Sequence, residues 1–285
     1  MKIAIASGKG GTGKTTVATN LAYVASHNGL SVAYLDCDVE EPNGHIFLKP
    51  AIENSKPVDR LVPKVNEETC TLCGECGEIC QYSAIVCIGN GVLVYPELCH
   101  ACGGCSLVCP VDAITEVPVP MGQLDTGRAG QVFFVQGLLN IGEAKSPPVI
   151  KAVRAAAPDT DLVIIDAPPG TSCPVIESIH GCDFVILVTE PTPFGLNDLK
   201  LAVEMVRALK IPFGVVINRA DLGDDEVRSY CIRQRIAVLA EIGDDREIAE
   251  AYSRGAMICE ALPDYRDLFE KLLKEVTHEA RTSIR

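Results

Sequence analysis

A cysteine motif occurs twice in this chain and sets narrow limits on its fold. The spacing C-x2-C-x2-C-x3-C appears at two places 29 residues apart, and Gly74 and Gly103 keep the same offset. The motif cysteines are Cys70, Cys73, Cys76 and Cys80 in the first copy, and Cys99, Cys102, Cys105 and Cys109 in the second. Self-similarity of this kind indicates an internal duplication.

The duplicated segment interrupts an otherwise cysteine-poor chain. Residues 63–118 hold nine of the 14 cysteines, and prolines at positions 63, 118 and 120 flank the segment. We therefore predict an inserted domain over residues 63–118 and a discontinuous domain made of residues 1–62 and 119–285. A chain of 285 residues is long enough for two domains with separate cores.

The cysteine spacing favours iron-sulfur clusters. Three thiolates at three-residue steps wrap one cluster, and the fourth cysteine of each motif ligates the other cluster. The predicted ligands are Cys70, Cys73, Cys76 and Cys109 for one [4Fe-4S] cluster, and Cys99, Cys102, Cys105 and Cys80 for the other. The segment resembles a bacterial dicluster ferredoxin, which implies an α+β fold. Structural zinc, the alternative, prefers two short cysteine pairs separated by a longer connection.

Two details of the cysteine segment do not follow from the motif. The second copy ends in Cys109-Pro110, as in the ferredoxin pattern, whereas the first ends in Cys80-Gln81. Cys87 lies between the copies, and we expect it to pack as a small hydrophobic residue and not to act as a ninth ligand.

Composition and the amino-terminal segment limit the partners and the compartment. The net charge is −13, which argues against nucleic acid as a partner. The apolar run before Gly8 is too short for a signal peptide, and no window reaches 18 apolar residues, so we expect no membrane insertion. We predict a cytoplasmic protein. In that reducing compartment cysteines more often bind metals or have no special role than form disulfides.

A phosphate-binding loop follows the first apolar run. Residues 8–16 satisfy G-x-x-x-x-G-K-[ST], between a predicted strand at residues 3–6 and a periodic helical segment that stops at Gly29. Successive N–H groups of such a loop converge on phosphate oxygens, and we expect Lys14 to reach the β- and γ-phosphates and Thr15 to bind Mg²⁺. The predicted nucleotide-binding residues are Gly8, Lys9, Gly10, Gly11, Thr12, Gly13, Lys14, Thr15 and Thr16.

The additional lysine gives K-G-G-T-G-K-T, which resembles the deviant Walker A motif of the MinD, ParA and nitrogenase iron protein class of ATPases. This resemblance implies that Lys9 contacts the nucleotide of a partner subunit in an ATP-dependent homodimer. A surface lysine exposed to water is the alternative. In the same class Asp38, after the strand at residues 31–35, would orient the attacking water, and Asp166, after the strand at residues 161–165, would hold Mg²⁺ through water.

Other residues have weaker support. An aspartate after a strand can also cap the following helix, which is the alternative for Asp38 and Asp166. The resemblance implies that Asn218, and less firmly Arg219, contact the adenine base, although an Asn there is often only a turn residue. Cys173 lies seven residues after Asp166, where the nitrogenase iron protein class places a cluster cysteine. This resemblance implies a position on the dimer axis, and a buried core position is the alternative.

The remaining pattern predicts a mostly parallel α/β sheet covered by helices on both faces. Apolar runs at residues 132–135, 162–165, 184–188, 215–217 and 237–239 alternate with helical stretches near 148–157, 196–209, 225–235 and 246–254. Near the end, Leu268, Phe269, Leu272 and Val276 define one face of a helix with mixed charges opposite. Mixed charge favours packing on the domain over binding to a membrane surface.

The whole chain resembles MinD-superfamily ATPases with an inserted ferredoxin domain. This implies a P-loop ATPase that binds ATP, ADP and Mg²⁺, and we expect ATP-gated electron transfer through the clusters to a redox partner. Cluster delivery to an apo acceptor protein, as in Mrp-type carriers, is the alternative, but those carriers use a C-x-x-C pair near the carboxyl end, whereas Cys231 and Cys259 stand alone here. A third possible function is that of a MinD-like positioning ATPase. Cobyrinate-type amidation would need a glutaminase module for which there is no room.

Overall fold

A computed structural model describes residues 1–283. Its contacts divide the chain into two units. The first unit contains Met1–Lys56, Leu124–Leu139 and the chain from Lys145 onward, and the second contains Pro57–Gln123 and Asn140–Ala144. The second unit extends beyond residues 63–118 on both sides and includes a short segment that the sequence pattern did not indicate.

The strands and helices alternate along most of the chain. The strands are β1 (Lys2–Ala6), β2 (Val32–Asp36), β3 (Ala51–Val65), β4 (Ile85–Ile88), β5 (Gly91–Val94), β6 (Ile114–Ala129), β7 (Val132–Leu139), β8 (Leu162–Asp166), β9 (Phe184–Thr189), β10 (Phe213–Asn218) and β11 (Val238–Ile242). The helices are α1 (Lys14–His27), α2 (Gly44–Leu48), α3 (Glu75–Ile79), α4 (Gly104–Leu107), α5 (Pro147–Ala155), α6 (Cys173–Ile179), α7 (Pro193–Ala208), α8 (Glu226–Gln234), α9 (Arg246–Ser253), α10 (Ile258–Ala261) and α11 (Arg266–Ser283), with 3-10 turns at Pro96–Leu98 and Pro263–Tyr265.

The first unit is built on a mostly parallel sheet, as the sequence predicts. Strand order in the sheet is β11-β10-β9-β1-β8-β2-β7-β6-β3, and every pair from β11 to β7 is parallel. The two-residue connection from β6 to β7 permits only an antiparallel pair. Strands β1, β2, β8 and β9 are almost continuous apolar runs because both of their faces are covered.

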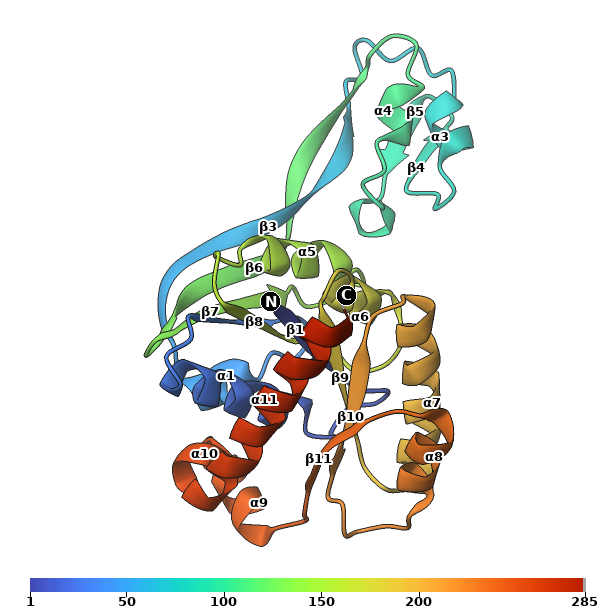
Figure 1. Cartoon of the computed structure of the whole chain (residues 1–285). Helices are drawn as coiled ribbons and strands as arrows, with labels where there is room; N and C mark the ends of the chain where they lie inside the picture. The colour runs from blue at the N-terminus through green and yellow to red at the C-terminus, as the bar shows by residue number, and fades with distance from the viewer. Residues whose placement is uncertain (284–285) are drawn as a thin grey trace. The chain divides into compact units, whose positions relative to one another are not determined.

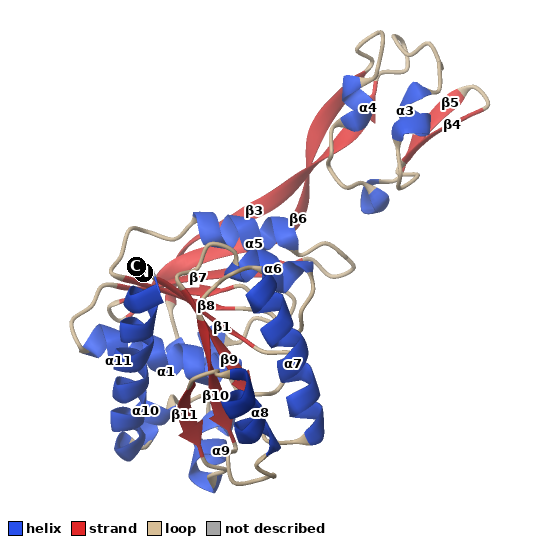
Figure 2. Ribbon diagram, turned by 45° about the vertical axis from the view of Figure 1, so that its right-hand side comes forward, coloured by secondary structure: helices blue, strands red, loops and turns tan. Residues whose placement is uncertain are grey.

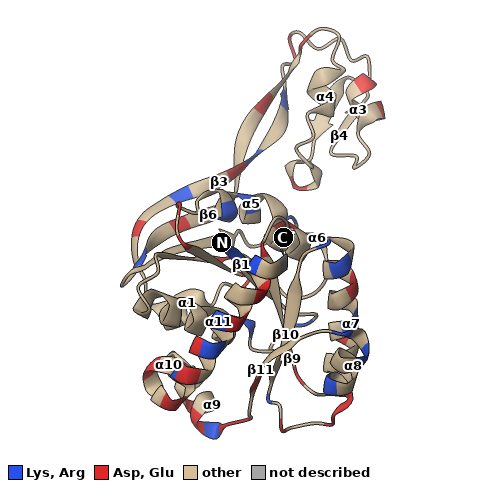
Figure 3. Cartoon of the chain, viewed as in Figure 1, with Lys and Arg blue, Asp and Glu red and all other residues tan. Residues whose placement is uncertain are grey.

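Helices cover both faces of the parallel strands. Helices α1, α10 and α11 lie on one face, and α5, α6, α7 and α8 lie on the other (Figures 1 and 2). On the last helix Phe269, Leu272, Leu273 and Val276 are buried against the core, so the predicted packing of this segment is confirmed. Its charges of both signs lie along the same helix (Figure 3). No helix among residues 1–283 is long and apolar enough to cross a membrane.

Two long strands, β3 and β6, run through the positions that the sequence pattern indicated as the borders of the inserted segment. Pro63 lies inside β3, and Pro118 and Pro120 lie inside β6, so these prolines do not mark the ends of elements. β3 is the last strand of the sheet, and an edge strand tolerates proline because one side of its backbone makes no ladder hydrogen bonds. Each of these strands begins in one unit and ends in the other.

The second unit is small and repeats its own backbone. Each half contributes one short helix, α3 or α4, and the two-stranded sheet β4–β5 is antiparallel. Left-handed backbone conformations recur at the 29-residue offset: Leu72 and Ala101 have φ of 56° and 51°, and Ser83 and Asp112 have 51° and 50°. Non-glycine residues rarely adopt this conformation, so its recurrence indicates that the duplication preserved backbone geometry as well as sequence.

A close contact between β7 and α5 gives a test of the packing of the first unit. A Cβ atom on Gly137 would lie 2.7 to 2.8 Å from methyl groups of Val39, Val149 and Val153. We expect Gly137→Ala to lower the free energy of unfolding by about 1–3 kcal/mol because the core is overpacked. Gly91→Ala is the matched control, since a Cβ there meets no atom within 4 Å. Chemical denaturation followed by circular dichroism measures both, and equal stability of the two variants would contradict the described packing.

Candidate functional site

Five neighbouring parallel strands end at one edge of the sheet, and each has a polar group of the site either as its last residue or just after it. The order is β10, β9, β1, β8 and β2. Asn218, Asp166 and Asp36 are the last residues of their strands, whereas the phosphate-binding loop follows β1 and Glu190 follows β9. The carboxyl edge of a parallel sheet is where nucleotides bind in folds of this kind.

The phosphate-binding loop connects β1 to α1, as predicted. Gly13 caps the helix with φ of 98°, and a Cβ there would lie 2.5 Å from Nδ2 of Asn218. That Nδ2 donates a hydrogen bond of 2.9 Å to the carbonyl of Thr12. Asn218 therefore supports the loop from β10, which is separated from β1 by β9, a role that the sequence did not indicate. The predicted contact of Asn218 and Arg219 with a base stays a prediction.

A cavity of about 440 Å³ opens over this loop. Its lining includes loop residues 10–16 except Thr12, together with Asp38, Asn218 and Arg219. The lining also includes Asp244, Asp245 and Tyr252, which the sequence did not indicate. N–H groups at the start of α1 and the positive end of its dipole favour an anionic group here. The Lys14 side chain is buried beside them.

Asp166 lies fully buried at the end of β8, next to Asp36 in register on β2. The hydroxyl of Tyr34 donates to Asp166 Oδ2 at 3.0 Å. Burial raises the pKa of Asp166, and Thr15, Lys14 and Tyr34 oppose that effect. Its second oxygen, Oδ1, is buried without a hydrogen-bond partner among the described residues. An oxygen in that state fits a water molecule on Mg²⁺, because a hydrated cation would supply the missing donor.

Asp36 fixes the turn that presents Asp38. The carboxylate of Asp36 is fully buried and accepts hydrogen bonds from the N–H of Gly44 at 2.9 Å and of Asp38 at 3.2 Å. Burial and the adjacent Asp166 raise the pKa of Asp36 well above its usual range. Asp38 itself lines the cavity, and burial raises its pKa to about 6, although Lys14 opposes the shift.

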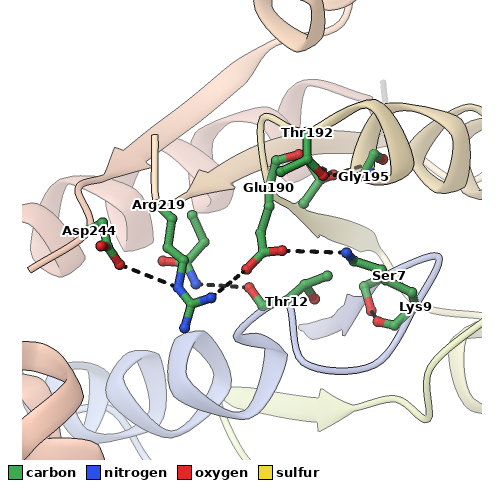
Figure 4. Close-up of polar contacts among 10 residues, drawn as sticks. Ser7, Lys9, Thr12, Glu190, Thr192, Gly195, Arg219 and Asp244 are labelled. Atoms are coloured by element: carbon green, nitrogen blue, oxygen red, sulfur yellow. Dashed lines mark hydrogen bonds and ion pairs between the residues drawn. The ribbon is translucent and has the colours of Figure 1, made fainter. Parts of the chain in front are cut away.

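Glu190 holds two cations at the rim of the site, and sequence reasoning missed it. Its carboxylate pairs with Lys9 Nζ at 3.5 Å and with the Arg219 guanidinium at 3.2 Å (Figure 4). Arg219 also pairs with Asp244 at 3.5 Å. The available sequence signal was its position just after the apolar run at residues 184–188. In the structure its side chain is only 12% exposed. In the single chain Lys9 is therefore neither free nor surrounded by water.

The motif cysteines surround two cavities within the second unit. The first is lined by Cys70, Cys73, Cys76 and Cys109, and the second by Cys80, Cys99, Cys102 and Cys105. Each cavity thus has three cysteines from one motif and the last cysteine of the other. Among residues 1–283 no group of three Cys, His, Asp or Glu side chains is arranged to hold a single metal ion. Ligands of a four-iron cluster bind different irons and need no such close grouping.

Backbone N–H groups point at the last cysteine of both motifs. Ala84 N–H donates to Cys80 Sγ at 3.3 Å, and Ala113 N–H donates to Cys109 Sγ at 3.2 Å. The two motif ends thus share one geometry, although Gln81 follows the first and Pro110 the second. Burial acts to raise the pKa of Cys80, but N–H groups of residues 82–85 outweigh it and the pKa lies below its usual value.

The other cysteines differ in exposure. Cys173 is exposed at the start of α6, whereas Cys231 and Cys259 are buried. The buried-core alternative for Cys173 is therefore wrong. Cys87 is half-buried and packs against the apolar cluster of Cys76, Ile85 and Ile114, and it also lines the first cavity.

Comparison with known proteins agrees with the geometry of the nucleotide cavity. Residues 3–258 match the family described as the CobQ/CobB/MinD/ParA nucleotide binding domain. The chain belongs to this family. It is a P-loop ATPase of the MinD/ParA class.

Relatives and solved structures cover nearly the whole chain. An uncharacterized protein of Methanocaldococcus jannaschii is 28% identical over 94% of this chain and 93% of its own. An iron-sulfur cluster carrier protein of Pyrococcus horikoshii is 25% identical over 96% and 86%. The cell division ATPase MinD of Pyrococcus furiosus has a similar fold, with a TM-score of 0.60, 22% identity and coverage of 97% and 98%.

The raised pKa of Asp38 predicts a pH-dependent stability of the nucleotide-free protein. Between pH 4 and about 6 the folded chain holds this proton more tightly than the unfolded chain, so stability falls as pH rises through that window. Asp38→Asn removes the titrating group and with it this loss of stability. Above pH 6 we therefore expect the variant to be more stable than the parent protein by about 1–2 kcal/mol. Near pH 4 the two should match.

Denaturation curves at several pH values measure this difference. Asp159→Asn is the control, because this exposed aspartate lies outside the cavity and should leave the pH profile unchanged. A constant gap between Asp38→Asn and the parent from pH 4 to 8 would contradict the role of burial at Asp38.

Proposed function

We propose that this P-loop ATPase couples ATP binding and hydrolysis to electron transfer through two [4Fe-4S] clusters. The observation that carries the proposal is the pair of cavities in the second unit, each lined by four motif cysteines in the exchanged arrangement. The first cluster would be held by Cys70, Cys73, Cys76 and Cys109, and the second by Cys99, Cys102, Cys105 and Cys80. When bound, such clusters supply one-electron oxidation and reduction.

The surroundings of the thiols suit a buried anionic group. N–H groups that donate to Cys80, Cys99 and Cys109 stabilise thiolates, which are the form that binds iron. Residues 63–118 carry one lysine against seven Asp or Glu. The redox partner in this proposal therefore presents a basic surface, because complementary charge favours encounter.

Each residue of the nucleotide cavity has a role in this proposal. Lys14 neutralises the β- and γ-phosphates, Thr15 binds Mg²⁺ directly, and Asp166 holds it through water at the unsatisfied Oδ1. Asp38 orients the attacking water. Lys9 leaves Glu190 and reaches the nucleotide of a second subunit when ATP joins two chains.

Backbone connections supply a route from the nucleotide to the second unit. The carbonyl of Val39, next to Asp38, accepts a hydrogen bond of 2.8 Å from the N–H of Leu139. The chain enters the second unit at the following residue, Asn140. Asn140 N–H donates to Met121 O at 3.0 Å, and its side chain donates to Pro120 O at 3.2 Å. A shift of Asp38 on loss of the γ-phosphate would thus pull on backbone that continues into the cysteine unit.

Cluster delivery is the second candidate function, and the carrier proteins among the relatives favour it. Those relatives are at most 27% identical to this chain. Here the cysteines nearest the carboxyl end, Cys231 and Cys259, are buried and 28 positions apart, so neither is available to share a cluster between subunits. Positioning ATPases such as MinD share only the fold at these identities.

The exchanged ligand arrangement predicts which cysteine variants resemble one another. Cys80→Ser and Cys99→Ser should lose the same cluster, and Cys109→Ser and Cys70→Ser the other. Iron should fall from about eight to about four atoms per chain in each variant. Iron and sulfide analysis of anaerobically purified protein, with EPR of the reduced form, measures this. Cys173→Ser is the control and should keep all the iron. If Cys80→Ser matched Cys70→Ser instead, the fourth ligands would not be exchanged.

Gating by nucleotide predicts that the cluster potentials depend on the bound nucleotide. We expect redox titrations with ATP and with ADP to give different midpoint potentials while the iron stays on the protein. Lys14→Ala should remove the difference because its site no longer holds the phosphates. Identical potentials in the two states would contradict the gating, and movement of iron to an added apo acceptor protein would favour delivery.

A further inference from the structure

The two cysteine cavities differ at one pair of equivalent positions. The 29-residue offset that relates the motifs also relates Cys87 to Glu116. Cys87 lies in β4, and Glu116 lies near the start of β6, where Ile85 and Ile114 are likewise equivalent. Both residues line their own cavity. The duplicated backbone therefore presents a thiol to the first cavity and a carboxylate to the second.

Cys87 lies against a ligand of the first cavity. Its Sγ is 4.0 Å from Sγ of Cys76, within contact for an S–H···S hydrogen bond. A cysteine bound to iron is a thiolate without a proton, so Cys87 must be the donor. A hydrogen bond to a ligand sulfur stabilises the reduced cluster, which carries one more negative charge. Cys87 thus favours reduction at the first site.

Glu116 acts in the opposite direction at the second cavity. Its Oε1 lies 3.7 Å from the position of a Cβ on Gly103, in the loop that follows Cys102. An ionised carboxylate only accepts hydrogen bonds and adds a negative charge beside the cavity. Negative charge disfavours an additional electron, although solvent weakens the effect because Glu116 is exposed. A ring stack of Tyr82 on His100, with centroids 3.5 Å apart, also lines this cavity.

We propose that Cys87 and Glu116 are positioning residues that set the potentials of the two clusters apart. Cys87 raises the potential at the first site through its hydrogen bond to Cys76, and Glu116 lowers the potential at the second through its charge. With both clusters bound, the reduced cluster at the second site would be oxidised by passing its electron to the cluster at the first site, which has the higher potential. This inference rests on the cluster assignment of the proposed function.

The test is an EPR-monitored redox titration of anaerobically purified full-length variants. Cys87→Ala should lower one midpoint potential, and Cys87→Ser should shift it less because the hydroxyl still donates. Glu116→Gln should raise the other midpoint potential. The controls are Ile88→Ala, an exposed neighbour on β4, and Glu68→Gln, which removes one exposed charge from the same unit. Neither control should move either potential by a comparable amount.

The outcomes separate this inference from the proposed function. Wild-type protein purified without iron would overturn the cluster assignment itself. A full iron content with unchanged potentials in Cys87→Ala and Glu116→Gln would overturn only the role of these residues. The role of these residues would also be overturned if both substitutions moved the potential of the same cluster, or if the shifts had the opposite directions. Opposite shifts on two different clusters, with iron retained, support the inference.

Discussion

The parallel direction of five adjacent strands is the constraint on which the nucleotide site depends. Because β10, β9, β1, β8 and β2 all run the same way, their carboxyl ends meet at one edge. Each strand end contributes one functional group over a short distance, from Asn218 through Glu190 to Asp36. Burial of both faces makes these strands apolar, so polar residues occur only where the strands end.

That arrangement concentrates negative charge in a low-dielectric interior. Asp36 and Asp166 are fully buried on neighbouring strands; burial disfavours the ionised form of both, and the charge of Asp166 further raises the pKa of Asp36. Hydrogen bonds from Tyr34 and from backbone N–H groups offset part of the cost, and Lys14 lies close to Asp166 and Asp38. One buried carboxylate oxygen, Oδ1 of Asp166, still lacks a partner among the described residues. The site is therefore built to take up a cation and a polyanion together.

The second unit differs from the first in the size of its apolar core. Its apolar clusters are small and include cysteines at their centres, such as Cys76 and Cys99. A core of that size gives little stabilisation by burial alone, and small domains commonly depend on metal ligation instead. Its recurring left-handed residues place two sets of four cysteines around two cavities. The duplication is imperfect at positions 87 and 116, where a thiol and a carboxylate make the two cavities chemically different.

The sequence by itself determined the elements whose signals are local. The phosphate-binding loop, the parallel α/β class and the amphipathic last helix follow from spacing and periodicity within short windows. The tertiary structure decided what depends on neighbours distant in the chain: the support of Thr12 by Asn218, the pairing of Lys9 with Glu190, and the use of two proline-containing segments as long strands. Such contacts arise from strand order, and no local pattern records which strand ends lie together.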